Sequence, residues 1–164
     1  MKKIMVLAAA LMVFAATGAF AFGLGLQANA NAGKNFNPGI AVTFKTEKIP
    51  LVFAANWYFG ETVQSIGVTG DYWLLNPSIT NVGDGSLNWF VGLGFFTGLT
   101  FIKDADMQFT GGLRIPLGLN MFIAKGVFEP FIQVAPSFGI RLIPSLGADG
   151  LFWPLSAGFR VWFK

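Results

Sequence analysis

Six polar side chains are the best candidates for chemistry in this sequence, because each stands on the sparse polar face of an alternating, otherwise apolar segment. They combine acids, bases and carboxamides, so they could form a polar relay, a narrow ion path or a hydrogen-bonded plug. The six are Gln27, Asp71, Arg114, Glu129, Gln133 and Arg160. Because buried charges must be paired, the pattern favours the plug, in which the arginines are structural.

Catalysis, cofactor binding and metal binding have little support in the sequence. The chain has no His and no Cys, which removes the commonest general base, the commonest metal ligand and all thiol chemistry. Its serines lie in no G-x-S-x-G elbow, and a serine nucleophile would lack its usual base. A lipid-modifying barrel that uses His with Ser is therefore disfavoured. We predict a non-enzymatic protein with no catalytic residue, no cofactor and no metal site.

The N-terminal segment has the features of a cleavable export signal. A basic start and an apolar stretch over 4–16 precede a small-x-small site at Ala19-Phe20-Ala21. The apolar stretch is shorter than the roughly 20 residues of a membrane-spanning helix. We predict that 1–21 is a signal peptide and that 22–164 is one barrel domain. Without Lys2 and Lys3 the net charge falls from +3 to +1, so we predict no nucleic-acid partner.

The composition indicates a membrane protein that crosses the bilayer with strands. Hydrophobic residues make up 54% of the chain and charged residues 12%, whereas soluble domains carry about a quarter charged residues. Beyond the leader, no apolar run approaches the roughly 18 residues that predict a transmembrane helix. Only a closed barrel satisfies backbone polar groups in lipid without helices. We therefore predict an all-β, antiparallel up-and-down transmembrane barrel in the outer membrane of a diderm bacterium.

Alternation of apolar and polar residues predicts eight strands, the smallest usual number for such a barrel. Segments rich in Gly, Pro, Asn and Asp separate them. The predicted strands are Phe22 to Asn31, Gly39 to Lys45, Leu51 to Phe59, Ser65 to Leu75, Leu87 to Thr97, Met107 to Met121, Val127 to Phe138 and Pro154 to Lys164.

The last of these segments is typical of the closing strand of an outer-membrane barrel. Its apolar residues suit lipid, and the residues between them suit a packed polar interior. The apolar face is Leu155, Ala157, Phe159, Val161 and Phe163, and the other face is Ser156, Gly158, Arg160 and Trp162. We interpret Gly158, Phe159, Val161 and Phe163 as an assembly signal, and the outer-membrane assembly machinery as its partner.

The direction of the strands follows if both termini are periplasmic. The connections after Lys45, Leu75 and Met121 are then periplasmic turns, although Asn76 to Ser86 is long for one. Aromatic residues would form a girdle at each interface. The periplasmic girdle is predicted from Trp73, Trp89, Phe122, Phe128, Trp162 and Phe163, and the outer girdle from Trp57, Phe59, Phe95, Phe109, Phe138 and Trp153.

Short motifs in the last three strands resemble a family of small outer-membrane β-barrels seen widely in spirochaetes and other diderms. They are Gly112-Leu-Arg-Ile-Pro-Leu-Gly-Leu119, Phe131-Ile-Gln-Val-Ala-Pro136 and Gly158-Phe-Arg-Val-Trp-Phe163. Asp71-Tyr-Trp and Phe90-Val-Gly-Leu-Gly94 resemble middle strands of the same family. More distantly, the chain resembles the eight-stranded OmpA, OmpX and OmpW-type barrels. The resemblance implies a surface-exposed outer-membrane barrel.

Two positions depart from the pattern of this family. The family usually has an acidic residue where this chain has Gln133, which leaves open an interior ion pair with Arg114 or Arg160. Glu129, four residues earlier on the same face, could substitute. The chain also has Lys164 beyond the aromatic residue that usually ends such proteins.

Three functions are compatible with this interpretation, and the first is preferred. The first is a structural or surface-display role in the envelope, with outer-membrane lipid as the surrounding partner. The second is a narrow pore for ions or small apolar solutes. The third is a soluble, exported, lipocalin-like binding barrel, which would turn the apolar stripe inward. The first predicts that bulky inward residues occlude the lumen, namely Tyr58, Trp73, Phe90, Phe131 and Trp162.

Overall fold

The computed structural model describes residues 21–32 and 37–163, and every regular element in those ranges is a β-strand. The predicted signal peptide, apart from Ala21, lies outside the described residues. In these ranges no helix has the length and apolar character needed to cross a membrane. The strands are β1 (Phe22–Ala32), β2 (Pro38–Thr46), β3 (Leu51–Tyr58), β4 (Val63–Leu75), β5 (Ser78–Val82), β6 (Gly85–Ile102), β7 (Gln108–Arg114), β8 (Leu117–Phe122), β9 (Phe128–Val134), β10 (Ser137–Ile143) and β11 (Gly147–Phe163).

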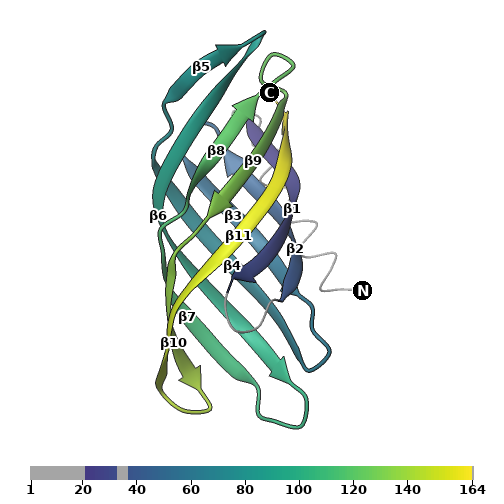
Figure 1. Ribbon diagram of the computed structural model, residues 1–164, viewed down its shortest axis with the longest axis vertical. Coiled ribbons are helices and arrows are strands. Elements are labelled where there is room, and N and C mark those ends of the chain that lie inside the picture. The colour runs from purple at the N-terminus through teal and green to yellow at the C-terminus, as the bar shows by residue number, and fades with distance from the viewer. Residues whose placement is uncertain (1–20, 33–36, 164) are drawn as a thin grey trace.

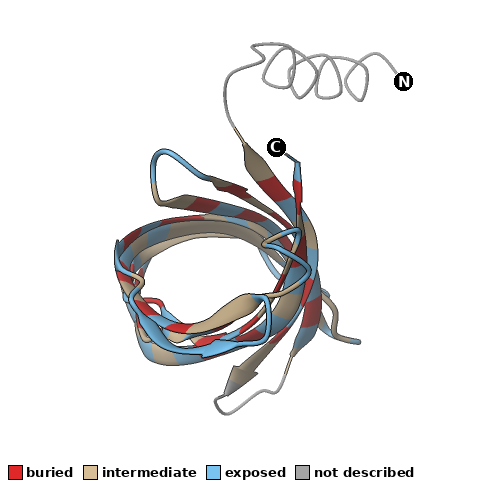
Figure 2. Ribbon diagram, turned by 90° about the horizontal axis from the view of Figure 1, so that it is seen from above, coloured by how far each residue is buried: buried red, intermediate tan, exposed pale blue. Residues whose placement is uncertain are grey.

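Antiparallel pairing joins these strands into a ring (Figure 1). Each strand from β1 to β4 pairs with the next, β4 pairs with β6, and β11 pairs with β1 to complete the circuit. Followed once around, the register that starts at Phe22 returns to β1 at Ala32, and such a stagger requires tilted strands. Viewed from above, the strands surround a central interior (Figure 2). The predicted antiparallel up-and-down barrel is confirmed.

The ring has eight strand positions, although eleven strands are assigned. β7 and β8 are one strand interrupted at Pro116, because both halves pair with β6 in a single continuous register. β9 and β10 are likewise one strand interrupted at Pro136, and both pair with β11. β5 pairs with β6 beyond the end of β4, so it adds no position to the ring.

The two ends of the barrel differ in what they carry. Phe22 pairs with Phe163, so β1 begins and β11 ends at the same end, which is uppermost in Figure 1. We call this the terminal end. The other end, which we call the loop end, carries the connections 59–62, 103–107 and 144–146.

Two predicted connections are largely strand. One is the connection Gly139 to Gly150, which lies between the predicted strands that end at Phe138 and start at Pro154: β10 continues to Ile143 and β11 starts at Gly147. Glycines and a proline hide the alternation there, and pairing with the neighbouring strands overrides that local signal. The long connection Asn76 to Ser86 contains a β-hairpin of β5 and the start of β6, closed by a turn at Gly83, whose φ is +57°. The hairpin extends the terminal end, which explains the length of the connection.

Alternation in the strands separates an apolar exterior from a polar interior. In β11, for example, Leu155 and Phe159 are exposed, whereas Ser156 and Arg160 are buried. Figure 2 shows the same banding of exposed and buried residues along other strands. Five charged side chains, Lys45, Asp71, Arg114, Glu129 and Arg160, are buried inside, and many large apolar side chains are exposed on the outside, which is the reverse of a soluble lipocalin-like barrel. The exterior is therefore suited to lipid.

Glycines leave space for large inward side chains. A Cβ on Gly118 would lie 2.8 Å from Cζ of Phe90, and a Cβ on Gly94 would collide with the carboxylate of Asp71. Both glycines lie on strands next to the side chains that they accommodate. At these positions a small residue on one strand therefore faces a large side chain on the next strand.

The separation of faces predicts opposite outcomes for two adjacent substitutions on β4. Val68 points outward and is 45% exposed, whereas Thr69 has the opposite parity, which it shares with the buried Asp71 and Trp73. We expect Val68→Arg to lower the free energy of unfolding in lipid vesicles by about 2–4 kcal/mol, because it places a charge in the apolar belt. Thr69→Arg should cost clearly less, since its guanidinium faces the polar lumen. Urea titration measures both, and equal losses would contradict the assignment of the two faces.

Candidate functional site in the barrel lumen

All six predicted polar residues are buried in the barrel. Their exposed fractions are 7% for Gln27, 2% for Asp71, 6% for Arg114, 0% for Glu129, 6% for Gln133 and 0% for Arg160. The structure brings Glu129 and Arg160 together in one cluster and Asp71 and Arg114 in another. Gln27 belongs to a separate chain of carboxamides.

Glu129 on β9 is the centre of the first cluster, which we call the Glu129 cluster. Its Oε1 accepts from Nζ of Lys45 at 2.7 Å and from Nδ2 of Asn120 at 2.8 Å. Its Oε2 accepts from Nε1 of Trp162 at 2.8 Å. Nη1 of Arg160 lies 3.4 Å from Oε1. A fully buried carboxylate is stable only when it is paired in this way, so the cluster draws β2, β8, β9 and β11 together across the lumen.

Arg160 fills the space between this carboxylate and the opposite wall. Its Nε donates to Oγ1 of Thr43 at 3.2 Å, and its guanidinium carbon lies 3.9 Å from the centre of the Phe131 ring. Both partners are themselves buried. The guanidinium is therefore held by a hydroxyl, a carboxylate and an aromatic face, which is a structural arrangement that leaves little space around it.

A stacked aromatic pair blocks the middle of the lumen. The rings of Trp73 and Phe90 lie 3.8 Å apart and are nearly parallel, at 6°. Nζ of Lys45 lies 3.8 Å from the centre of the Trp73 ring, so the pair is joined to the Glu129 cluster. Trp73 and Phe90 are 2% and 0% exposed. Together with the cluster they form what we call the plug.

A second ion pair joins β4 and β7, which lie on either side of β6. Nε of Arg114 on β7 is 3.1 Å from Oδ1 of Asp71 on β4, and both side chains are buried. Gln27 donates to Asn29 at 2.8 Å, and Asn29 donates to Asn56 at 3.0 Å. These contacts pair polar groups of β1, β3, β4 and β7 inside the ring.

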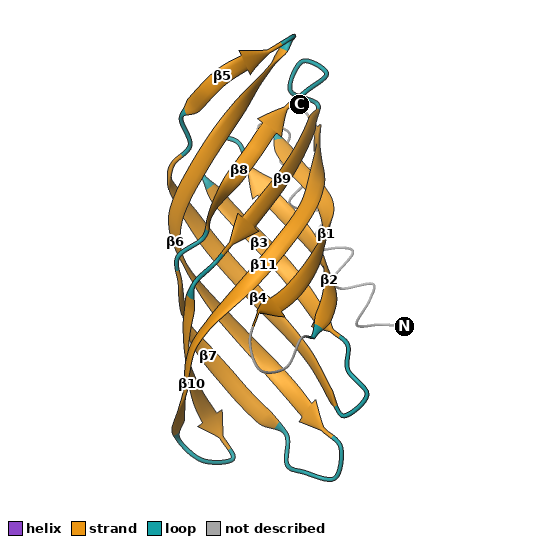
Figure 3. Ribbon diagram, viewed as in Figure 1, coloured by secondary structure: helices purple, strands orange, loops and turns teal. Residues whose placement is uncertain are grey.

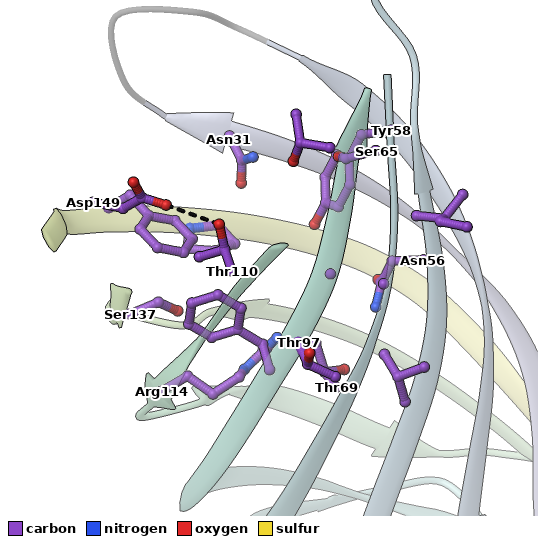
Figure 4. Close-up of a pocket in the computed structure, with 18 residues that line it drawn as sticks. Asn31, Asn56, Tyr58, Ser65, Thr69, Thr97, Thr110, Arg114, Ser137 and Asp149 are labelled. Carbon is purple, nitrogen blue, oxygen red and sulfur yellow. Dashed lines mark hydrogen bonds between the residues drawn. The ribbon is translucent and has the colours of Figure 1, made fainter. Parts of the chain in front are cut away.

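Two cavities lie on opposite sides of the plug. The loop-end cavity has a volume of about 450 Å³, and its lining includes Tyr58, Thr69 and Arg114 (Figure 4). At its rim, Thr110 donates to Asp149 at 3.1 Å. The terminal-end cavity has a volume of about 430 Å³ and is lined in part by Lys45. No residue lines both cavities, so the plug separates them.

Sequence reasoning missed two partners of the buried ions, namely Lys45, which contacts Glu129, and Thr43, which accepts from Arg160. Lys45 stands at the end of a predicted strand, where its charge looked like part of a solvated turn, and Thr43 has no charge to draw attention. The signal was nevertheless present, because both fall on the inward parity of Gly39 to Lys45. Their roles depend on β2 lying close to β9 and β11 across the lumen, which the sequence does not reveal.

The predicted periplasmic girdle is wrong at three positions. Trp73 and Trp162 are 2% and 7% exposed, and their side chains lie in the plug. Phe122 is half-buried, contacts the Trp162 ring and lies 5.4 Å from Nζ of Lys45. Each of the three lies two residues from a buried polar residue on the same strand and therefore points inward. An interfacial girdle needs aromatic residues that point outward, so these three were assigned to the wrong face. Trp89 and Phe163 are exposed on the exterior.

The residues predicted as an assembly signal lie on the last part of β11. Phe159 and Phe163 are exposed on the apolar exterior, and Val161 is half-buried. Phe163 stacks on Phe22 at 5.2 Å where the ring of strands meets. Gly158 is paired with Gln27. Among the described residues, no group of three or more His, Cys, Asp or Glu is placed to hold a metal ion.

Comparison with known proteins gives similarities of architecture. No protein-family model matches the sequence, and no curated protein does. The chain is similar to a major outer membrane protein of Thermus thermophilus (11% identity, TM-score 0.45, 88% of this chain and 100% of that chain). It is also similar to Neisserial surface protein A (15%, 0.44, 88% and 97%) and to the attachment invasion locus protein Ail of Yersinia pestis (11%, 0.42, 88% and 96%).

At TM-scores below 0.5 these likenesses assign no family to the chain, and the spirochaete-type assignment gains no support from them. Similarities of this size identify no function.

Removal of the central carboxylate should destabilise the barrel strongly. We expect Glu129→Ala to lower the free energy of unfolding by about 3–5 kcal/mol, because Lys45 and Arg160 would be left as buried, unpaired cations. The matched control Glu47→Gln changes an exposed carboxylate and should lie within about 0.5 kcal/mol of the parent. Urea unfolding in detergent micelles measures both.

A double variant tests whether the loss comes from the ion pair itself. Lys45→Met combined with Glu129→Gln should cost less than the two single changes added together, since it removes a cation and its counterion at once. Strict additivity would contradict the coupling of Lys45 to Glu129.

Proposed function

We propose that this chain is an occluded outer-membrane β-barrel with a non-enzymatic, structural or surface-display role in the cell envelope. The plug carries this proposal. A lumen filled by paired charges and stacked rings favours a rigid wall element over a channel. The exterior supports the membrane location, because residues such as Leu26, Leu93, Leu113 and Ile132 expose more than half of their surface, as the lipid face of a barrel does.

The role in display depends on the orientation, which we propose to be terminal end toward the periplasm. The predicted export signal and closing-strand signal both favour it, and the assembly machinery would then read Phe159 and Phe163 from the periplasm. The connections 59–62, 103–107 and 144–146 would face outside. They are short, which favours a structural role over adhesion through a large binding surface.

A narrow pore is the second candidate, and one observation favours it. Cavities of about 450 and 430 Å³ approach the plug from the two ends, so displacement of a few side chains would connect them. A conducting protein would have to move the Glu129 cluster, and separating Glu129 from Lys45, Asn120 and Trp162 would break three hydrogen bonds, which is unfavourable in a dry interior.

Conductance across a planar bilayer separates these two functions. We expect the refolded barrel, 22–164, to give no reproducible steps, because Trp73 and Phe90 close the lumen. A Trp73→Ala, Phe90→Ala double variant should create discrete steps if the plug is the obstruction. Ile132→Ala, on the lipid face, is the matched control and should stay silent. Discrete steps from the parent protein, altered by Arg114→Ala or Arg160→Ala, would replace the structural proposal with the pore.

Accessibility of an epitope tag on intact cells tests the orientation. A tag inserted between Asp104 and Ala105, in a loop-end connection, should bind antibody on intact cells. A tag inserted at Lys125, in the turn between β8 and β9, should bind only after the outer membrane is permeabilised. The reverse pattern would contradict the proposed orientation, and labelling of neither site in lysed cells would show that the tagged proteins had been degraded.

A further inference from the structure

The buried charges around Glu129 do not balance. In the part of the chain that the structure describes, the buried charged side chains are Lys45, Asp71, Arg114, Glu129 and Arg160. Asp71 and Arg114 form one pair, at 3.1 Å. Glu129 is left with two cations, because Lys45 and Arg160 both lie against its Oε1. One buried positive charge therefore has no counterion among the described residues, which is unfavourable.

Arg160 is the less well compensated of the two cations. The Glu129 carboxylate accepts from Lys45, Asn120 and Trp162, and it accepts no hydrogen bond from Arg160. Nη1 of Arg160 lies 3.4 Å from Oε1, but neither Nη1 nor Nη2 has a hydrogen-bond partner among the described residues. A second anion beside Lys45 would share that ammonium and leave more of the Glu129 charge to Arg160.

The ammonium of Lys45 lies at the floor of the terminal-end cavity. Its Nζ is 3.8 Å from the centre of the Trp73 ring, 5.4 Å from that of Phe122 and 5.5 Å from that of Trp162. Lys45 and these three aromatic residues all line the cavity, and Lys45 is 5% exposed. An ammonium has three N–H donors, and Glu129 is its one hydrogen-bond acceptor among the residues that the structure describes.

The mouth of this cavity lies among the connections of the terminal end, which Figure 3 shows as loops at the upper end of the barrel. Its lining includes Glu47 after β2, Asp84 in the turn of the β5 hairpin and Lys125 in the turn after β8. All three side chains are exposed, so water and salt screen their charges, whereas a buried charge is screened much less. An anion that enters the cavity therefore meets its strongest electrostatic interaction at Lys45.

The size and lining of the cavity suit a small molecule. Its volume of about 430 Å³ lies within the range of small-molecule sites, roughly 300–1,000 Å³. Carboxylate and phosphate oxygens accept charge-assisted hydrogen bonds from an ammonium. Asn76 and Ser86 also line the cavity, and both carry side-chain donors for further oxygens. These features favour an oxyanion that comes from water through the mouth of the barrel.

We propose that the terminal-end cavity binds a small, water-soluble oxyanion through Nζ of Lys45. The ligand carries a carboxylate or phosphate group and supplies the counterion that the Glu129 cluster lacks. This inference goes beyond the structural role proposed above. It needs no opening of the plug or of the wall, and it holds for either orientation of the barrel in the membrane.

Binding is tested with inorganic phosphate as the probe and the barrel refolded in non-ionic detergent, with chloride exchanged for phosphate at constant ionic strength. We expect a saturable change in tryptophan fluorescence, because Trp73 and Trp162 line the cavity. Lys45→Met should bind phosphate about tenfold more weakly, since a charge-assisted hydrogen bond is lost. Lys45→Arg keeps the cation and should retain binding.

Lys125→Met is the matched control, because it removes an exposed lysine from the lining of the same cavity. It should bind phosphate as the parent does. An equal loss in Lys45→Met and Lys125→Met would overturn the site, since it would show only a general attraction at the mouth. The absence of saturable binding to the folded parent would overturn it as well.

The unfolding of the parent protein gives a second test, which does not require that Lys45→Met folds. A ligand that binds only the folded state stabilises it, so phosphate should raise the urea midpoint of the parent and of Lys125→Met. The effect is measured at low phosphate concentration, where the general salt effect is small. A midpoint that does not rise in the parent would overturn the site.

Lipid composition separates a water-soluble ligand from a lipid headgroup. Phosphate affinity should be equal in phosphatidylcholine vesicles with and without phosphatidylglycerol, because the lining of the cavity lies within the ring of strands and at its terminal-end connections. Competition by phosphatidylglycerol would overturn the proposal of a water-soluble ligand and assign the oxyanion to a lipid headgroup.

Discussion

The ring of backbone hydrogen bonds is the constraint on which the rest of this structure depends. A barrel that faces lipid has to pair its N–H and C=O groups within the wall, and the pairing of β1 with β11 completes the circuit. Once the circuit is complete, the period-two geometry of a strand sends alternate side chains outward and inward. The apolar exterior and the polar interior are therefore two results of one closure, and the interior must accommodate the charges that the strands turn inward.

The interior meets this requirement by gathering cations around a small number of acceptors. Glu129 accepts hydrogen bonds from Lys45, Asn120 and Trp162 and lies close to Arg160. The aromatic rings of Trp73 and Phe90 then occupy the space that remains, and Gly118 makes space for Phe90. The interaction that stabilises the charges thus also closes the lumen. Charge pairing around Glu129 therefore accounts both for the structural role and for the occluded lumen. The space that the plug does not occupy forms the two cavities.

The sequence by itself determined the architecture and the parity of individual residues. Alternation assigned Arg114, Glu129 and Arg160 to the inward face, where the structure places them. It also predicted eight strands, and the ring has eight strand positions. Both predictions succeed because alternation with a period of two is a local property of the sequence. It could not determine which inward residues meet. Lys45 contacts Glu129, which lies 84 residues away in the chain, only because strand tilt and register bring β2 opposite β9. The same holds for Trp73 and Trp162, whose interior contacts depend on distant strands, and for the hairpin of β5, which cross-strand pairing stabilises against its local turn signals. Contacts across a lumen are set by closure, and closure is a property of the whole ring.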